Sequence, residues 1–189
     1  MLESAAVGFR AVKREGMNVL AARKYPNPRQ GPLSRDEAET RRLAYAIKTT
    51  ASPSRDFDTA AREMAALITG PCWLVPIPDS TGSTDANTRL ASMIAMYCPG
   101  AQVARAICRT QPIQSQCTRH KLALGPIPQE QHHFARTPKT LTLRQTYLVD
   151  NVTTSGNTLA AARAALGFGA GLVFADATSH HAEVQATLL

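Results

Sequence analysis

The stretch that decides the fold is Thr146-Tyr147-Leu148-Val149-Asp150-Asn151-Val152-Thr153-Thr154-Ser155-Gly156-Asn157-Thr158-Leu159. Its apolar start predicts a buried strand, and the Ala-rich residues 159–166 predict a helix, since alanine has the highest helix propensity. Gly167 stands where helices commonly end in the left-handed conformation. The hydroxyl- and glycine-rich turn would point backbone amides and the positive end of the helix dipole into one small space. That space suits a phosphate group.

Asp150 adds a carboxylate at the carboxyl end of the predicted strand. It can accept hydrogen bonds from sugar hydroxyls that lie beside the bound phosphate. Phosphate and sugar together describe a site for a ribose 5-phosphate group. The alternative is an ordinary strand–turn–helix connection with a Thr-rich N-cap. The pattern favours the binding site, because capping needs a single hydroxyl and this turn has several.

The same stretch resembles the phosphoribosyl-pyrophosphate (PRPP) signature of the type I phosphoribosyltransferases. That signature is a run of apolar residues, a pair of acidic positions, an apolar residue and a Thr/Ser/Gly loop. Asn151 occupies the second acidic position, and Ser155 stands where Thr or Gly is more usual. The positions that follow the pattern are Tyr147, Leu148, Val149, Asp150, Val152, Thr153, Thr154, Gly156 and Thr158.

The remaining sequence predicts an α/β fold, because predicted strands alternate with predicted helices and such alternation forms a parallel sheet covered on both faces. The resemblance implies the Rossmann-like, doubly wound parallel sheet of the type I phosphoribosyltransferase fold. It also implies a small N-terminal helical or hood region over residues 1–50, followed by the α/β domain over residues 51–189.

The resemblance further implies roles for individual residues of the signature. Asp150 and Asn151 would be the catalytic pair, with Asp150 also acting indirectly on a bound Mg²⁺, the expected cofactor. The residues that would hold the 5-phosphate are Thr153, Thr154, Ser155, Gly156, Asn157 and Thr158.

A second polar loop follows the predicted strand at residues 72–78 and leads into another helix. In the family, the corresponding loop holds pyrophosphate and its magnesium, which implies this role for Pro78, Asp79, Ser80 and Thr81. The amides of the loop, with the hydroxyls of residues 80, 83 and 84, could bind the anion. A capped turn with residue 83 or 84 as N-cap explains the same residues equally well.

Residues 109–140 form a long polar segment without sustained periodicity, and such segments inside a compact domain are usually functional or mobile. In the family, a mobile loop at this point folds over PRPP. The resemblance therefore implies that Arg109, Arg119 and Lys121 reach the pyrophosphate, since cations and above all arginine suit that contact. Candidates for proton transfer near neutral pH are His120, His132 and His133.

The resemblance is closest to the competence protein F (ComF)-like branch. It extends loosely over residues 40–178 through Tyr45-Ala46-Ile47-Lys48, Pro76-Ile77-Pro78, the helix around Asn87 and Arg109-Thr110-Gln111. The N-terminal cysteine zinc ribbon of that branch and the Arg-rich loop expected after Pro78 are not present in the sequence.

The activity implied is transfer of a phosphoribosyl group from PRPP to a nitrogen acceptor, with release of pyrophosphate. A non-catalytic nucleotide-binding regulatory or DNA-uptake module that retains the same pocket is the alternative, and a phosphatase or nucleotide hydrolase is a third. The expected partners are PRPP or a nucleotide, with DNA and a second copy of the chain as further candidates.

Bulk properties limit the remaining classes. A formal net charge of +7 favours anionic partners without choosing between nucleic acid and polyphosphate. No apolar run approaches the ~20 residues of a membrane-spanning helix, and the N-terminus lacks the pattern of a signal peptide. We therefore expect a cytoplasmic protein that does not act at a membrane. None of the 4 cysteines forms a Cys-x-x-Cys pair, so reduced structural thiols are expected.

Local patterns predict the other elements. A capping box at Ser34–Glu37 opens a helix that runs to about Thr49, and an apolar stripe from Phe57 to Ile68 predicts a second helix. A third helix is expected over residues 86–97. Further strands are expected at residues 103–108 and 172–176, whereas the first 30 residues show no strong period.

Overall fold

The protein forms an α/β fold around a six-stranded sheet with the strand order β1-β2-β8-β7-β3-β4. The computed structural model describes residues 10–14, 16–26, 31–49, 54–115, 118–119 and 122–177. Strands β2, β8, β7, β3 and β4 run parallel to one another, and β1 pairs with β2 in the antiparallel sense. The strands are β1 (Arg10–Arg14), β2 (Met17–Lys24), β3 (Cys72–Pro76), β4 (Gln102–Val103), β7 (Gln145–Thr153) and β8 (Ala170–Asp176).

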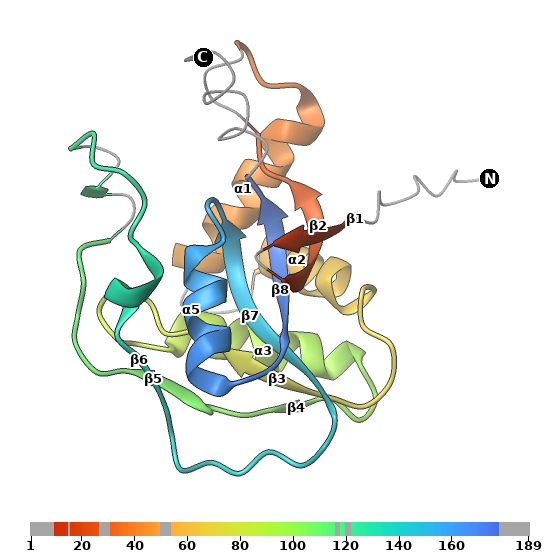
Figure 1. The fold of residues 1–189 in the computed structure, drawn as a ribbon. Helices are drawn as coiled ribbons and strands as arrows, with labels where there is room; N and C mark the ends of the chain where they lie inside the picture. The colour runs from red at the N-terminus through yellow and green to blue at the C-terminus, as the bar shows by residue number, and fades with distance from the viewer. Residues whose placement is uncertain are drawn as a thin grey trace.

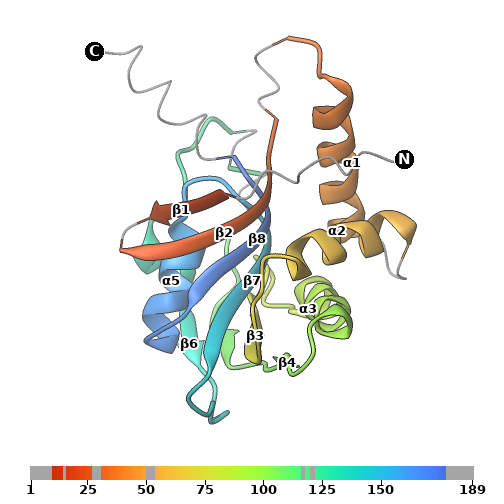
Figure 2. The ribbon, with the colours of Figure 1, turned by 90° about the vertical axis from the view of Figure 1, so that its right-hand side faces the viewer.

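Helices cover both faces of this sheet. Figure 2 shows α1 (Arg35–Thr49), α2 (Arg55–Ala65) and α3 (Asp85–Tyr97) on one face and α5 (Asn157–Leu166) on the other. Beside α5 lies a small two-stranded sheet of β5 (Ile107–Arg109) and β6 (Phe134–Arg136), and the 3₁₀ helix η1 (Gln129–His132) comes directly before β6 (Figure 1). The predicted α/β fold with a parallel sheet between helical layers is therefore confirmed.

The order of the strands creates a reversal between β3 and β7. From β3 the chain passes through α3 to β4 on one side, and from β7 it passes through α5 to β8 on the opposite side. In open α/β sheets, ligands bind outside the carboxyl ends of the strands at such a switch point. The topology alone therefore directs attention to the loops that follow β3 and β7.

The helix boundaries follow the local chemistry that the sequence predicts. The Ser34 amide donates to Glu37 Oε2 at 2.9 Å and the Glu37 amide donates to Ser34 Oγ at 3.3 Å, which is the predicted capping box, and the helix α1 ends at Thr49. Gly167 ends α5 in the left-handed conformation with a φ of 91°. These predictions are confirmed.

The first 30 residues show no strong period in the sequence, yet two of their segments form the strands β1 and β2. β2 lies directly beside β8, so part of the predicted hood range 1–50 belongs to the main sheet. The strand escaped prediction because Ala21 and Ala22 are both buried, so the clean alternation of a half-exposed strand is lost. We also find α1 in this range, as the helical part of the prediction expects.

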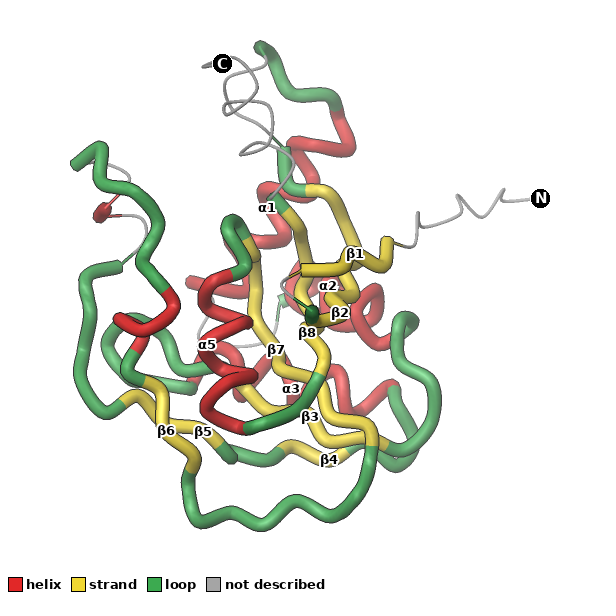
Figure 3. The backbone as a smooth tube through the Cα atoms, viewed as in Figure 1, coloured by secondary structure: helices red, strands yellow, loops and turns green. Residues whose placement is uncertain are grey.

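The single strand predicted over residues 103–108 is split in two. The Ala104 amide donates to the Leu74 carbonyl at 2.9 Å, which closes the pairing of β4 with β3. The chain then turns away, and Ile107 pairs with Arg136 of β6. The predicted irregular segment 109–140 therefore contains regular elements, η1 and β6, and Figure 3 shows long loops on either side of the small sheet. The pairing partner lies far along the chain, where no local pattern reveals it.

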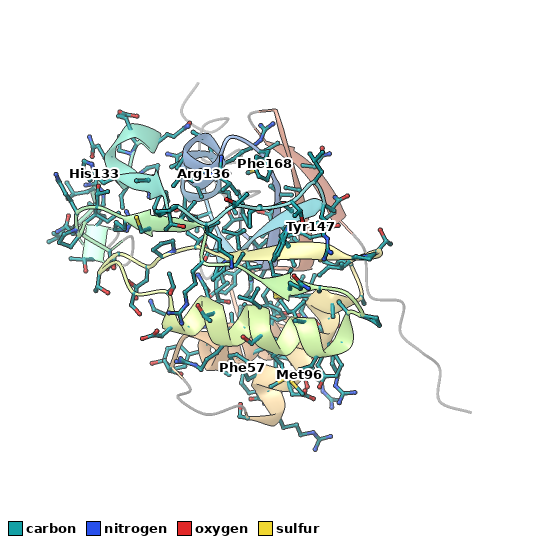
Figure 4. The ribbon with its side chains drawn as sticks, turned by 90° about the horizontal axis from the view of Figure 1, so that it is seen from below. Phe57, Met96, His133, Arg136, Tyr147 and Phe168 are labelled. Carbon is teal, nitrogen blue, oxygen red and sulfur yellow. The ribbon has the colours of Figure 1, made fainter. Side chains whose placement is uncertain are left out.

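Two apolar clusters hold the layers together. One includes Phe57, Tyr147 and Phe174 and lies between the sheet and α1–α3, and the other includes Leu148 and Leu159 and lies beneath α5. Figure 4 shows Phe57 and Met96 on the side of the sheet covered by α1–α3, well separated from His133, Arg136 and Phe168. In the described part of the chain, no helix has the length and apolar character needed to cross a membrane.

Two of the cysteines are buried in the first cluster. Cys72 and Cys98 are free thiols with almost no exposure, as the sequence predicts. Burial, with the nearby Cys98, raises the pKa of the Cys72 thiol to about 11. These thiols therefore act as apolar side chains at neutral pH. Cys108 is free and exposed, and Cys117 lies outside the described residues.

Candidate functional site

The strands β3 and β7 diverge at Asp150. Their last paired residues are Pro76 and Val149, after which the Ile77 amide donates to the Val149 carbonyl at 3.1 Å. From Asp150 onward β7 continues along β8 alone, as far as Thr153. Asp150 therefore stands where β3 and β7 part, within β7 rather than at its carboxyl end as the sequence predicts, because pairing with β8 extends the strand to Thr153.

The Asp150 carboxylate is half-buried and held in place by two amide donors. Its Oδ1 accepts from the Asn151 backbone amide at 2.8 Å and from Asn87 Nδ2 at 3.2 Å. Asn87 also donates to the Ile77 carbonyl at 2.8 Å, so one side chain of α3 links the ends of both strands. Burial raises the pKa of the Asp150 carboxyl, and the two amides and the charge of Arg109 offset this only in part.

Asn151 lies in a different environment from its neighbour. Successive side chains of a strand point to opposite faces, and Asn151 shares its face with Val149, which packs in the cluster beneath α1–α3. Its Nδ2 donates to the Ala44 carbonyl of α1 at 2.8 Å. Its Oδ1 is buried and has no partner among the described residues. The structure therefore gives Asn151 a role in holding α1, and does not place its amide group alongside the carboxylate of Asp150.

The turn after β7 has the geometry expected of an anion site. Gly156 adopts a left-handed φ of 86° at the N-cap of α5, and the Asn157 amide donates to Ser155 Oγ at 3.3 Å. A glycine N-cap supplies no side-chain acceptor to the following amides of the first turn. Uncapped amides at a helix N-terminus attract anions.

The remaining residues of the predicted 5-phosphate loop surround this turn. Thr153 is buried, and its carbonyl accepts from the Ala177 amide at 2.8 Å. Asn157 Nδ2 donates to the Ile127 carbonyl at 2.8 Å, which ties the start of α5 to the long segment before η1. Thr154 and Thr158 are half-buried. The structure thus gathers residues 153–158 at one end of the sheet.

The loop after β3 is closed by its own carboxylate. Asp79 Oδ1 accepts from the Thr81 amide at 2.8 Å, the Thr81 hydroxyl at 2.7 Å and the Ser83 amide at 3.1 Å. Two backbone bonds, from Asp79 to the Ser83 carbonyl at 2.8 Å and from Gly82 to the Asp79 carbonyl at 3.1 Å, complete the turn. The amides of Thr81 and Ser83 are therefore already engaged by the Asp79 carboxylate.

The other residues of this loop take structural positions. Pro78 is buried, and the Ser80 carbonyl accepts from the Ile113 amide at 2.9 Å. The N-cap of α3 is Thr84, whose side chain makes no capping hydrogen bond, and Ser83 Oγ accepts from the Asp85 amide at 3.1 Å. The alternative of a capped turn, left open from the sequence, is therefore met in the position of the N-cap but not in a capping bond from its side chain.

Arg109 connects this loop to the small sheet. Its Nε donates to the Asp79 carbonyl at 2.7 Å, its Nη2 to the Pro78 carbonyl at 3.4 Å, and its Nη1 to the His132 carbonyl. The guanidinium lies 4.3 Å from the centroid of the Phe134 ring. Burial lowers the pKa of Arg109, while the charges of Asp79 and Asp150 act in the opposite direction. Arg109 is thus close to both carboxylates but is used to fasten the loop.

The structure does not bring the other predicted cations to the switch point. Arg119 Nε donates to the Gly125 carbonyl at 2.9 Å within its own loop. Arg119 also lines a cavity of about 250 Å³ together with Ile127 and His133. Lys121 and His120 lie outside the described residues.

Of the predicted histidines, His132 has the most unusual environment. It is 3% exposed, and its ring lies 5.6 Å from that of Phe134 at an angle of 18°. Burial, with the charge of Arg109, lowers the pKa of His132 to about 4. His132 is therefore neutral at physiological pH and does not titrate in the range that the sequence argument assumed. His133 is exposed and has a left-handed φ of 51°.

Two cavities are found on the α5 side, and neither is lined by Asp150 or by residues 153–158. The larger, of about 310 Å³, lies between η1, β6 and α5 and is lined by Gln129, Glu130, His133, Phe134, Ala161, Ala164 and Ala165. The smaller is the one beside Arg119.

The donor set fits a magnesium ion that arrives with its ligand. Across the described ranges, no group of three or more His, Cys, Asp or Glu residues is placed to hold a metal. The charges of the Asp79 and Asp150 carboxylates both act on Arg109, and Mg²⁺ is often held by one or two carboxylates plus the phosphates of a substrate.

Sequence reasoning missed three contributors to this site. These are the link made by Asn87, the contact of Asn151 with Ala44, and the tie between Asn157 and Ile127. Only the link made by Asn87 had a signal in the sequence, namely a polar residue on the apolar face of the predicted helix. A buried side-chain amide usually has a hydrogen-bond partner, so such a residue indicates a contact.

Comparisons with known proteins add no assignment. No protein-family model matches the chain, and the search of curated proteins finds no match. The fold and the geometry around Asp150 are therefore the basis of the functional argument.

Proposed function

We propose that the protein binds a ligand containing ribose 5-phosphate at the ends of β3 and β7, and that it is a phosphoribosyltransferase. The observation that carries the proposal is the placement of Asp150 and the glycine-capped start of α5 together at the topological switch point. A phosphate on the amides of α5 would leave the sugar beside Asp150. The signature resemblance supports the same arrangement.

In the proposed reaction, the bond between the ribose C1 and the pyrophosphate oxygen breaks, and the pyrophosphate leaves with the electron pair. The lone pair of the acceptor nitrogen forms the new bond to C1. Asp150 would accept hydrogen bonds from the ribose hydroxyls and stabilise the positive charge that develops on the ring. The amides of α5 would hold the 5-phosphate. A bound Mg²⁺, held by Asp150, Asp79 and the phosphates, would neutralise charge on the leaving group.

Asp150→Ala tests this proposal. We expect calorimetry with PRPP and Mg²⁺ to show binding to the wild type that is lost in the variant, and pyrophosphate release with a panel of nitrogenous bases to be abolished. Asp85→Ala is the matched control, since Asp85 is an exposed carboxylate at the start of α3. Unchanged binding and turnover in the Asp150 variant would remove the basis of the assignment.

The second candidate is a non-catalytic nucleotide-binding module, of the regulatory or DNA-uptake kind. It is favoured by Asn151, whose amide contacts α1 where the family signature has a second acid, and by the closed loop at Asp79. A net charge of +7 would suit a DNA partner. Tight DNA binding without any PRPP-dependent release of pyrophosphate would favour this candidate over the transferase.

A further inference from the structure

We infer that the protein binds single-stranded nucleic acid on a basic surface at the amino end of the main sheet. This basic surface combines four exposed cations with two aromatic rings, namely Arg105, Arg136, Lys139, Arg144, Trp73 and Phe168. It lies toward the opposite end of the strands from Asp150 and the start of α5, and it shares no residue with that site. The inference therefore does not depend on the proposed function.

The starts of three neighbouring strands bring one cation and both rings together. Trp73 is the second residue of β3, Arg144 comes directly before β7, and Phe168 lies two residues before β8. Thr146 of β7 pairs with Trp73 in the sheet. The Thr146 carbonyl would also lie 3.4 Å from a methyl group added to Gly169, the residue that follows Phe168. The two rings thus flank the first turns of β7.

The small sheet of β5 and β6 adds the other three cations. Arg136 of β6 pairs with Ile107 of β5. Thr137 Oγ1 donates to the Arg105 carbonyl at 2.9 Å and accepts from the Lys139 amide at 3.4 Å. Figure 1 shows the loop from β6 to β7 passing below α5, at the amino end of the sheet. Cations far apart in the sequence are therefore neighbours in the fold.

The charge of this region is almost entirely of one sign. Between Asp85 and Asp150 the sequence contains a single acidic residue, Glu130, which lies in η1. In the part of the chain that the structure describes, every ion pair joins residues of β2, α1 and α2, so none involves a cation of the basic surface. A cluster of exposed cations without carboxylate partners attracts a polyanion.

Two of the cations lie on the aromatic rings. The Arg136 guanidinium is 6.0 Å from the centroid of Phe168, and that of Arg144 is 5.6 Å from the centroid of Trp73. Phe168 is 38% exposed, and Figure 4 shows it beside Arg136. A guanidinium on a ring still presents N–H donors at its edge, which suit a phosphate.

This alternation of cation and ring indicates the kind of polyanion. Along a single strand of nucleic acid, phosphates alternate with bases whose faces are free to stack on aromatic side chains. A duplex offers phosphates at higher density but keeps its base faces inside its own stack. The rings therefore favour a single strand, whereas charge alone would favour the duplex.

Trp73 is the single tryptophan of the chain, so its fluorescence reports directly on the basic surface. We expect a thymidine oligonucleotide of about 12 nucleotides, without a terminal phosphate, to quench this fluorescence in the full-length wild type. The logarithm of the binding constant should fall with the logarithm of the salt concentration with a slope of about −3, because each of four phosphate contacts contributes about −0.7. A duplex of the same length should bind at least about fivefold more weakly at about 0.15 M salt, the loss of one stacked base.

A pair of double variants separates this surface from general positive charge. At about 0.15 M salt, Arg136→Gln combined with Arg144→Gln should weaken oligonucleotide binding by about tenfold and make the salt slope shallower by about 1.4. Arg35→Gln combined with Arg41→Gln removes the same charge from exposed positions of α1. This control should keep both the affinity and the slope of the wild type.

A second pair of variants tests the stacking contribution. Phe168→Ala should weaken binding of the single strand by at least about fivefold and leave the salt slope unchanged, because no charge is lost. Tyr45→Ala removes an aromatic ring that is 68% exposed on α1, and it should bind as the wild type does.

Four results would overturn the inference. They are unquenched Trp73 fluorescence, equal losses in the two arginine double variants, a duplex that binds as tightly as the single strand, and displacement of the oligonucleotide by ribose 5-phosphate. The last result would place the strand at the start of α5 instead of on the basic surface. A wild type that does not bind ribose 5-phosphate would overturn the proposed function and leave this inference standing.

Discussion

Asp150 and Asn151 show how far adjacent residues of a strand can differ in role. The pleat directs Asp150 toward the switch point and Asn151 toward α1. An amide suits the second position because it can donate to the Ala44 carbonyl, whereas a carboxylate would place two acceptors face to face. The departure of Asn151 from the family signature therefore has a structural explanation in this protein.

Asn151→Asp tests this explanation. It restores the second acidic position of the signature, but we expect it to lower the free energy of unfolding by about 1–3 kcal/mol, because a charged acceptor would face the Ala44 carbonyl. Urea denaturation followed by circular dichroism measures the change. Asn18→Asp, at an exposed position of β2, is the control and should stay within about 0.5 kcal/mol of the wild type. Equal stability of Asn151→Asp and the wild type would contradict the assigned contact.

His132 predicts a dependence of stability on pH. Its folded pKa of about 4 lies below the ordinary value of 6.5, so between these values the unfolded chain binds a proton that the folded chain does not. Stability is therefore complete above pH ~6.5 and falls as the pH drops toward ~4, by about 2–3 kcal/mol from this residue.

Urea denaturation at several pH values between 7 and 4 measures this effect. His132→Leu should lack it, so the difference in stability between the wild type and this variant should narrow, or reverse, as the pH falls. His133→Asn changes the exposed neighbouring imidazole and suits its left-handed backbone. That variant should keep the wild-type slope. A parallel pH dependence in wild type and His132→Leu would show that His132 is not the group responsible.

At the scale of elements, glycines in the left-handed conformation mark both ends of α5. Gly156 opens the helix and Gly167 closes it. Gly167 is exposed, and a methyl group added there would meet nothing within 4 Å, so any cost of substitution comes from the backbone alone. Backbone geometry at a glycine therefore sets both ends of α5.

Gly167→Ala should therefore destabilise the protein by about 1–2 kcal/mol, the cost of a left-handed conformation for an L-residue. Gly125→Ala is a matched control, because Gly125 has equally open space and is not in the left-handed region. Thermal denaturation should show a lower midpoint for the first variant and little change for the second. Equal midpoints for both variants would argue against the left-handed C-cap.

The sequence predicted the elements whose signals are local. The capping box of α1, the apolar stripe of α2 and the glycine after α5 each depend on neighbouring residues, and the structure confirms them. β2 and the division between β4 and β5 depend on partners far along the chain, namely β8, β3 and β6. The sequence of one strand does not indicate which distant strand it pairs with, so these elements were missed.

At the scale of the whole molecule, side chains from elements far apart in the sequence hold the helices against the sheet. Arg23 of β2 makes a bidentate pair with Glu63 of α2 at 2.6 and 2.7 Å and reaches Glu39 of α1 at 3.4 Å. This network fixes α1 and α2 over the sheet, and Asn151 adds a tie from α1 to β7. The carboxyl end of the sheet is therefore bordered by α1 as well as by the two loops.

The position of the candidate site could be predicted from the sequence, but its detailed state could not. Asp150 and residues 153–158 lie together at the switch point, as the strand–turn–helix pattern indicates. The engagement of the Asp79 carboxylate by its own loop, and of Arg109 by backbone carbonyls, depends on contacts between segments far apart in the sequence, such as the bond from the Ile113 amide to the Ser80 carbonyl. No spacing in the sequence encodes those contacts.

The measurement that tests the central claim most directly is a titration of the ¹⁵N-labelled protein with ribose 5-phosphate, followed by amide chemical shifts. We predict that the largest shifts occur at Asp150, Gly156, Thr158 and Leu159, because the phosphate would lie on the first turn of α5 and the sugar beside the carboxylate. Shifts confined to the cavity between η1 and α5, at Glu130 and Ala164, or no shifts at millimolar ligand, would contradict the account.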